Sequence, residues 1–529
     1  MTLPLSSLRG YVAEGLSVGF AVAFPPRTSV GKAFHVSGNS VRVKASLSLP
    51  LSLLLLVLAV PALGQSAPIQ PLTTTELVAW LTAGISGPRL ARLVGERGLA
   101  TLPTNRELRQ VESAGAGKDL MRVLNSGNVQ SAQIGAAIPA ALLRAAAQAR
   151  AQKFHEAETE LRALVAADPN NSSVHFALGT MLRQQEQYDD AYDELVAALK
   201  LMPDLPENHS ALSYLFYRLD DGPNAVAEAR TALSIDPKNS EAYQFLGLGH
   251  YSLGQYLAAI HAYTESLQRD PDNPDTYYDL GIALHAAGNL PAAITAYQRA
   301  IQLRPAFWEA HSNLGLIRHE QGDLALAVQE YRAAKKLAPG EASVRNNLGN
   351  TYCDEGNFDA AIAELNELYR QHPEWQQGHS CMASAFMAKN NYDAAVEQLK
   401  MAVHQNPGGA NEHRVLGQVL MLDNKPEEAL HELEIAVSLN PDSDVAHHLL
   451  GTVLFQQQDL KGAEKEFREA LRVNASADNH FSLAACLMSM DRYQEALAEI
   501  ETATRLDPDR QLYRARREEL LKLMQTNSR

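Results

Sequence analysis

Residues 240–273 read SEAYQFLGLGHYSLGQYLAAIHAYTESLQRDPDN, and residues 274–307 read PDTYYDLGIALHAAGNLPAAITAYQRAIQLRPAF. Counted from the first residue of each stretch, both have glycine at position 8, alanine at position 20, tyrosine at position 24 and proline at position 32. A fixed period of 34 residues predicts a stacked array of repeats rather than one globular core. The proline series comprises Pro169, Pro203, Pro237, Pro271, Pro305, Pro339, Pro373, Pro407 and Pro441, then Ala475 in place of proline, and Pro508 after a slip of one residue.

Each repeat has two segments whose apolar residues recur at helical spacing, so each repeat is predicted to form a helical hairpin. Small residues at positions 8 and 20 allow two helix backbones to approach closely, and the larger residue at position 24 fills the remaining space. Proline at position 32 cannot continue a helix, so it ends the second helix and turns the chain into the next repeat. Stacked hairpins then bury in series the apolar face that one hairpin leaves open.

This pattern resembles the tetratricopeptide repeat over eleven units, at about residues 138–511. The first unit has Ala145 where glycine is usual, which suits a terminal capping unit. The resemblance implies an all-α fold: a right-handed superhelical α-solenoid of about eleven hairpins. We expect a small helical module at residues 74–137 before the array, and a C-terminal capping helix and tail at residues 512–529.

The segment before the module has the layout of a secretory signal. Residues 47–64 form an apolar run that ends in Ala-Leu-Gly, and Arg42 and Lys44 precede it. We expect a signal peptide there, a linker at residues 65–73, and a non-native or disordered leader at residues 1–46, with translation starting at a valine such as Val30 or Val41. An uncleaved signal anchor in the inner membrane is the alternative.

The composition disfavours several classes of function. The formal charge of −15 disfavours unspecific nucleic-acid binding.

The chain has three cysteines, Cys353, Cys381 and Cys486. The first two lie at positions 12 and 6 of successive repeats, an offset of roughly 9 Å of helix rise, so we expect no ready disulfide bond and interpret all three as packing residues or free thiols.

Histidine recurs at position 4 of seven repeats, and a metal site is the hypothesis to weigh. Equivalent positions in adjacent hairpins are roughly 8–10 Å apart, too far to share one ion. We therefore expect these histidines to pack between paired helices, and we expect no metal and no cofactor. No nucleophile, paired-carboxylate or dinucleotide motif is present, so we expect no enzymatic activity. The histidines are His175, His209, His311, His379, His413, His447 and His480.

The resemblance implies that positions 2, 5, 6, 9, 12 and 13 of each first helix line a concave groove. Position 2 is acidic in four successive repeats, Glu207, Glu241, Asp275 and Glu309, which would favour a basic ligand. The alternative is that these carboxylates stabilise helix N-termini by about 0.3–1 kcal/mol each. The candidate peptide-binding residues are an aromatic group and a polar ladder: Tyr214, Tyr217, Phe245, Tyr251, Tyr278, Asp279, Asn313, Asn346, Asn347 and Asn350.

Asparagine offers a donor and an acceptor, so a ladder of it can hold a peptide backbone without reading its sequence. Similar ladders line the repeat region of O-GlcNAc transferase; a solvated helix surface is the alternative. We therefore expect a non-enzymatic scaffold that binds protein or peptide partners, with no nucleic acid and no membrane span after signal cleavage. We expect it to be bacterial, exported, and periplasmic or secreted. The alternatives are an adaptor for envelope assembly or polysaccharide export, and a repeat region associated with glycosyl transfer.

Overall fold

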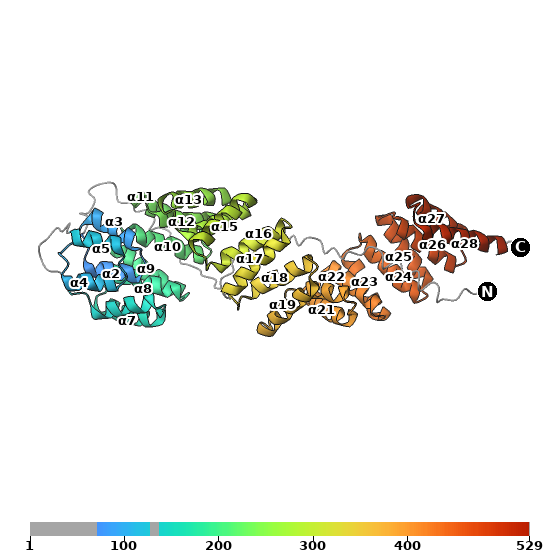
Figure 1. Cartoon of the computed structure of the whole chain (residues 1–529), viewed down its shortest axis with the longest axis horizontal. Helices are drawn as coiled ribbons and strands as arrows, with labels where there is room; N and C mark the ends of the chain where they lie inside the picture. Colours follow the sequence, from blue (N-terminus) through green and yellow to red (C-terminus); the bar gives the residue numbers. More distant parts are fainter. Residues whose placement is uncertain (1–70, 127–136, 528–529) are drawn as a thin grey trace, which may run out of the picture. The chain divides into compact units, whose positions relative to one another are not determined.

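The computed structural model describes residues 71–126 and 137–527 (Figure 1). Within them the chain forms 27 α-helices, and the sole β pairing in this part is an isolated bridge between Leu72 and Leu99. The expected all-α class and the solenoid of helical hairpins are confirmed. The predicted leader, the signal peptide and most of the linker lie outside the described residues.

The helices fall into two compact units that divide between Pro305 and Ala306. The first unit holds the module and five hairpins: α2 (Thr74–Thr82), α3 (Gly87–Arg97), α4 (Asn105–Ser113) and α5 (Lys118–Ser126), then α6–α7 (Ala140–Arg150, Phe154–Ala167), α8–α9 (Ser172–Gln184, Tyr188–Leu201), α10–α11 (Pro206–Arg218, Gly222–Ile235), α12–α13 (Ser240–Ser252, Tyr256–Arg269) and α14–α15 (Pro274–Ala286, Leu290–Leu303).

The second unit holds six hairpins and a final helix: α16–α17 (Trp308–Glu320, Leu324–Leu337), α18–α19 (Ala342–Asp354, Phe358–Gln371), α20–α21 (His379–Ala388, Tyr392–Gln405), α22–α23 (Ala410–Leu422, Pro426–Leu439), α24–α25 (Asp444–Gln456, Leu460–Val473), α26–α27 (Ala477–Ser489, Tyr493–Leu506) and α28 (Gln511–Asn527). Helix α28 packs against α27 and buries Tyr513 and Leu520 completely, so it covers the last hairpin.

Close packing within each hairpin follows the repeat positions. A Cβ atom added to Gly451, at position 8, would lie 2.8 Å from ring carbons of Phe467, at position 24. In the repeat with Ser213 at position 8, position 24 is the smaller residue Ala229. The Ser213 hydroxyl donates a 2.7 Å hydrogen bond to the carbonyl of Ala225. The expected pairing of a small residue at position 8 with a filler at position 24 is confirmed.

We expect Gly451→Ala to lower the free energy of unfolding by about 1–3 kcal/mol, because the buried Phe467 ring must leave its place. Gly340→Ala is the matched control, since a Cβ there meets nothing within 4 Å and its φ is not positive. Urea denaturation followed by circular dichroism measures both variants. Equal stability of the two would contradict the packing rule.

The N-terminal module is joined to the repeats by a continuous apolar core. Leu77, Val78 and Trp80 of α2 are fully buried, and α2 packs against both α6 and α8. One hydrophobic cluster extends from Leu72 to Leu215. Within the module, Thr74 Oγ1 donates a 3.0 Å hydrogen bond to Glu107 and so links α2 to α4. The module and the first three hairpins therefore share one core.

The structure contradicts the interpretation of Cys353 and Cys381 as unlinked residues, because the two form a disulfide bond with their Cα atoms 6.0 Å apart. The Sγ atom of Cys381 lies 3.5 Å from the carbonyl oxygen of Gly349, one helical turn before Cys353. Helices α18 and α20 are thus staggered, and Cys381, at repeat position 6, lies beside repeat positions 8 to 12 of α18. The expectation failed because it assumed that equal positions lie level. Cys486 is a free, buried cysteine, as expected.

No helix in the described ranges has both the length and the apolar character needed to cross a membrane. The same ranges contain no group of histidine, cysteine and acidic residues able to hold a metal ion.

Candidate functional site

The concave positions of α8, at the start of the array, are covered by the module. Ser173, Phe176 and Thr180, at positions 2, 5 and 9, are 1%, 4% and 3% exposed, and α2 packs against this helix. Sequence reasoning placed groove-lining residues there by repeat position alone. The structure leaves the concave positions open only further along the first unit, from the C-terminal half of α10 onward.

Helix α3 of the module places an arginine on the first acidic position of the groove. Arg89 Nε donates to Glu207 Oε1 at 2.5 Å, and its Nη1 lies 2.7 Å from Asp236 Oδ2. Glu207 is only 2% exposed. Burial alone lowers the pKa of Arg89, but Glu207 and Asp236 outweigh it and raise that pKa above its usual value. The basic ligand expected at Glu207 is therefore a residue of the same chain.

The other three position-2 acids have different surroundings. Glu241 is exposed and lines a pocket beside the module. Asp275 is exposed and accepts two hydrogen bonds from Arg304, at 2.6 and 2.8 Å. Glu309 belongs to the second unit. Of the three acids in the first unit, Glu207 and Asp275 are therefore already paired with arginines of the same chain.

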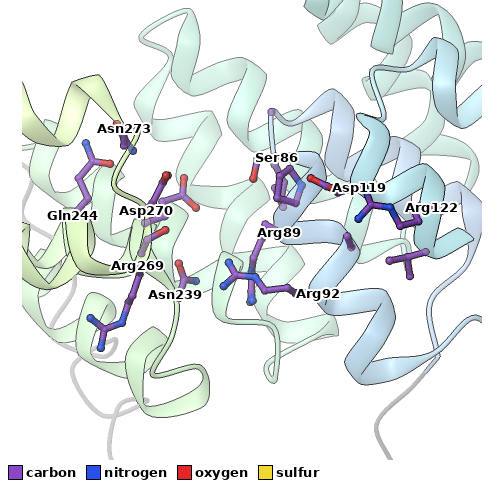
Figure 2. A pocket seen from close by; sticks show the side chains of 17 residues that line it. Ser86, Arg89, Arg92, Asp119, Arg122, Asn239, Gln244, Arg269, Asp270 and Asn273 are labelled. Carbon is purple, nitrogen blue, oxygen red and sulfur yellow. Dashed lines mark ion pairs between the residues drawn. The ribbon is translucent and has the colours of Figure 1, made fainter. Parts of the chain in front are cut away.

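The pocket beside Glu241 has a volume of about 770 Å³ and lies between the module and the hairpin α12–α13 (Figure 2). Arg89, Arg92 and Arg122 contribute from the module, while Gln244 and Arg269 contribute from the hairpin. Sequence reasoning missed this pocket because no repeat position indicates where the module docks.

The aromatic residues selected from the sequence gather on neighbouring helices of the first unit. The Tyr214 ring lies 6.0 Å from Tyr217 and 5.1 Å from Phe245, between ring centroids. Tyr251 packs on the same apolar cluster, whose core includes Phe245 and the buried Tyr263. Phe245 is 8% exposed and belongs to the core, whereas the three tyrosines Tyr214, Tyr217 and Tyr251 keep part of their surface in the groove.

Tyr278 has a different partner from the other aromatic residues. Its ring lies 5.9 Å from that of Tyr297, on the second helix of its own hairpin. On the opposite side of the group, the guanidinium of Arg183 lies 4.5 Å from the centroid of the Tyr214 ring. The aromatic group thus extends over α10 and α12 and is flanked by Tyr278 on α14.

Asp279 is partly buried, and the next residue, Leu280, packs on the same apolar cluster as these rings. Burial raises the pKa of its carboxyl group to about 7, and Asp275 adds to the shift, while a 2.8 Å hydrogen bond from Gln244 Nε2 opposes it. Burial is the main cause of the raised pKa of Tyr217 and of Tyr263, and the Asp279 carboxylate is the next cause for both phenols. The site therefore combines one poorly hydrated carboxyl group with several tyrosine rings.

The asparagines selected from the sequence lie in the second unit. Asn313, Asn347 and Asn350 are partly exposed, whereas Asn346 is 5% exposed. A Cβ on Gly378 would lie 3.2 Å from Asn346 Oδ1, so this amide faces the turn before α20. Asn346 therefore contributes to packing between repeats and not to the open surface.

The position-4 histidines form a set of contacts that the sequence analysis described only as packing. In six of the seven repeats the Nδ1 atom lies 2.5–2.7 Å from a glutamate carboxylate on the second helix of the hairpin, 19 residues later. In the seventh, His379 faces Gln398 at 2.8 Å. The expected packing between paired helices is confirmed, and the constant spacing to glutamate was a signal present in the sequence. The pairs are His175–Glu194, His209–Glu228, His311–Glu330, His413–Glu432, His447–Glu466 and His480–Glu499.

One family model described as tetratricopeptide repeat matches residues 142–206, 210–274, 245–306, 278–342 and 381–444, and a second model with the same description matches residues 318–385. The chain belongs to the tetratricopeptide repeat family. A model described as anaphase-promoting complex, cyclosome, subunit 3 also matches residues 428–503 of this tetratricopeptide repeat protein. Among curated proteins, none matches the chain.

Solved structures that are similar to parts of this tetratricopeptide repeat protein include the following three. The crystal structure of MamA is 26% identical, covers 30% of this chain and 93% of its own, and has a TM-score of 0.29. The crystal structure of YrrB, described as a TPR protein with an unusual peptide-binding site, is 23% identical, covers 37% and 97%, and has a TM-score of 0.30. The APC/C hetero-tetramer Cut9–Hcn1 is 16% identical, covers 70% and 73%, and has a TM-score of 0.42.

Proposed function

We propose that this tetratricopeptide repeat protein is a non-enzymatic scaffold that binds an extended peptide segment of a partner protein. The binding surface is the concave side of α10, α12 and α14 in the first unit. The observation that carries the proposal is the group of tyrosines Tyr214, Tyr217 and Tyr251, which pack on one apolar cluster and stay partly exposed. Tyrosine supplies large contact area together with a polar group, and it is enriched in the energetic centres of interfaces.

The arrangement of the module supports the same surface. The module covers the concave positions of α8, and its Arg89 forms an ion pair with Glu207. A peptide can therefore bind only to concave positions that follow these residues in the array. The pocket beside Glu241 extends that open surface up to the module, and Gln244 belongs both to the pocket wall and to the contact with Asp279. A peptide lying on the aromatic group therefore has room at its end nearest the module.

We further propose that the protein works outside the cytoplasm. The apolar run at residues 47–64 supports export. The Cys353–Cys381 disulfide bond supports an oxidising compartment, because such bonds are rare in proteins kept in a reducing cytosol.

The experiment is selection of binding dodecapeptides from a random phage-displayed library on the full chain, followed by affinity measurements with the selected peptides. We expect Tyr217→Leu and Tyr251→Leu each to weaken binding at least about tenfold, which corresponds to about 1.4 kcal/mol. Tyr392→Leu is the matched control, because Tyr392 lies at the start of the second helix of a hairpin in the second unit.

Equal affinity of the Tyr217, Tyr251 and Tyr392 variants would contradict the proposal. The double change Asn313→Ala, Asn347→Ala tests the second unit separately, with circular dichroism to show that helicity is kept. If that double change abolishes binding while the tyrosine variants retain it, the peptide surface lies in the second unit instead.

A further inference from the structure

The concave positions of three successive repeats in the second unit carry no negative charge. These repeats begin at residues 376, 410 and 444, and none of their positions 2, 5, 6, 9, 12 and 13 holds an acidic residue. In the first unit, by contrast, position 2 is Glu207, Glu241 and Asp275 in successive repeats. The concave positions around α22 therefore differ in charge from the rest of a chain whose formal charge is −15.

One arginine lies among these positions, at position 5 of α22. Arg414 Nη2 donates to Asn411 Oδ1 at 2.7 Å, and its Nη1 donates to Gln418 Oε1 at 3.4 Å. Both partners are neutral amides of the same helix. The acid nearest in sequence, Glu412, instead accepts a hydrogen bond from Asn406. In the described part of the chain no aspartate or glutamate forms an ion pair with Arg414, which is partly exposed.

The missing counter-ion has an energetic consequence. Burial lowers the pKa of Arg414, and no carboxylate opposes that shift. Arg345 in the same unit, by comparison, lies 3.1 Å from the carboxylate of Glu364. A partly buried cation without a counter-ion carries a desolvation cost that an anion from a partner reduces. A guanidinium presents its N–H donors in one plane and so matches the two oxygens of a carboxylate.

An apolar row accompanies the arginine at position 12 of four successive repeats. Its members are partly exposed and pack on the apolar clusters of the second unit. Met421 follows Arg414 by seven residues, which is two turns or about 10 Å along the same face of α22. Methionine is unbranched and polarizable, so it adapts to apolar side chains of different shapes. The methionine row consists of Met387, Met421, Phe455 and Met488.

Position 12 has a different character in the first unit. There it is occupied by charged or polar residues and by the tyrosines of the aromatic group, in the order Arg183, Tyr217, Tyr251 and His285. The same structural position thus changes from polar and aromatic to methionine-rich along the array. The two units therefore present different chemistry at equivalent concave positions.

We propose that Arg414 and the methionine row form a second binding surface, which takes a partner segment that combines apolar side chains with an aspartate or glutamate side chain. This inference goes beyond the proposed function, because the surface lies in the other unit and prefers a ligand of different chemistry. The apolar side chains of the segment pack on the methionine row, and its carboxylate pairs with the Arg414 guanidinium. The apolar run of this chain at residues 47–64 lacks the required carboxylate, because it contains no acidic residue.

The experiment compares two selections from a random phage-displayed library of dodecapeptides, one on the full chain and one on full-length Arg414→Gln. We expect the unchanged chain to select acidic peptides rich in leucine, phenylalanine or methionine that Arg414→Gln does not select. Such a peptide is then synthesised with an amidated C-terminus, so that only its side chains supply a carboxylate, and again with glutamine as the replacement for its acidic residue. By fluorescence anisotropy, the acidic form is expected to bind at least about tenfold more tightly.

Matched variants separate the two parts of the surface from general effects. Met421→Gln is expected to weaken the acidic peptide at least about fivefold, whereas Met401→Gln, at a methionine that is 48% exposed on the second helix α21, is expected to leave its affinity unchanged. Arg472→Gln is the control for Arg414→Gln, because Arg472 is exposed and already pairs with Glu469 and Asp442. Circular dichroism shows that each variant keeps its helicity.

Several results would overturn the inference. One is that Arg414→Gln selects the same acidic peptides, and another is that the full chain selects no acidic class. Equal affinity of the acidic and glutamine forms for the unchanged chain would do the same without relying on any variant. Selected peptides that lose affinity in Tyr217→Leu but not in Arg414→Gln belong to the first unit, so in that case the proposed function stands while this second surface fails.

Discussion

Arg89→Met is expected to lower the free energy of unfolding of the first unit by about 3–5 kcal/mol, because it leaves a buried carboxylate without its partner. Glu207 is 2% exposed, and in the described part of the chain Arg89 is the one cation that forms an ion pair with Glu207 or Asp236. Methionine keeps an apolar stem like that of the arginine side chain, so the loss of unfolding free energy reflects the missing charge more than missing packing. Hydrogen exchange measured by mass spectrometry on peptides from α2 and α3 gives the change in protection.

Two further variants separate the ion pair from general damage to α3. Arg92→Met removes an exposed arginine from the same helix and is expected to change stability by less than about 0.5 kcal/mol. Arg89→Met combined with Glu207→Leu removes the arginine and its more buried carboxylate together, leaves Asp236 without its arginine, and is expected to recover part of the loss. If Arg89→Met proves as stable as Arg92→Met, the Arg89 ion pairs do not contribute to holding the module on the repeats.

Cys381→Ala is expected to destabilise the second unit by about 3–4 kcal/mol, the loop-closure value for cysteines 28 residues apart. The bond joins α18 to α20, so the effect is confined to the hairpins around it. Urea denaturation followed by circular dichroism, with and without dithiothreitol, measures the difference. Reduction should shift the curve of the unchanged protein toward that of Cys381→Ala and leave the variant unaffected.

The single variant Cys353→Ala and the double variant provide the internal check. All three variants are expected to have similar stability, because removing either sulfur breaks the same bond. An unchanged protein whose denaturation curve is insensitive to dithiothreitol would show that the two thiols are not linked in solution.

The fold could be predicted from the sequence because its determinants are local and periodic. Proline at position 32 ends a helix by its own covalent structure, and Gly451 faces Phe467 across one short turn. The aromatic group was also predictable, because Tyr214 and Phe245 occupy defined repeat positions on adjacent first helices. In each case the contacts join residues within one repeat or between neighbours.

The features that could not be predicted from the sequence are contacts between elements whose relative position the 34-residue period does not define. Arg89 and Glu207 are 118 residues apart, and no period connects the module to the array. The disulfide bond depends on the stagger between α18 and α20, and α20 begins at His379, at position 4, after Gly378 adopts a left-handed φ of 99°. The histidine–glutamate pairs were visible as a spacing of 19 residues, but a spacing alone does not give the direction of a side chain.

The covalent link between α18 and α20 has a mechanical consequence for the second unit. A solenoid yields to tension by widening the gaps between successive hairpins, since each hairpin contacts only its neighbours. The Cys353–Cys381 bond fixes one such gap at a Cα–Cα distance of 6.0 Å. Elastic extension of the second unit must then be taken up by the remaining junctions, and a pulling experiment on the oxidised chain would record a contour length shorter by the 28-residue loop that the bond closes.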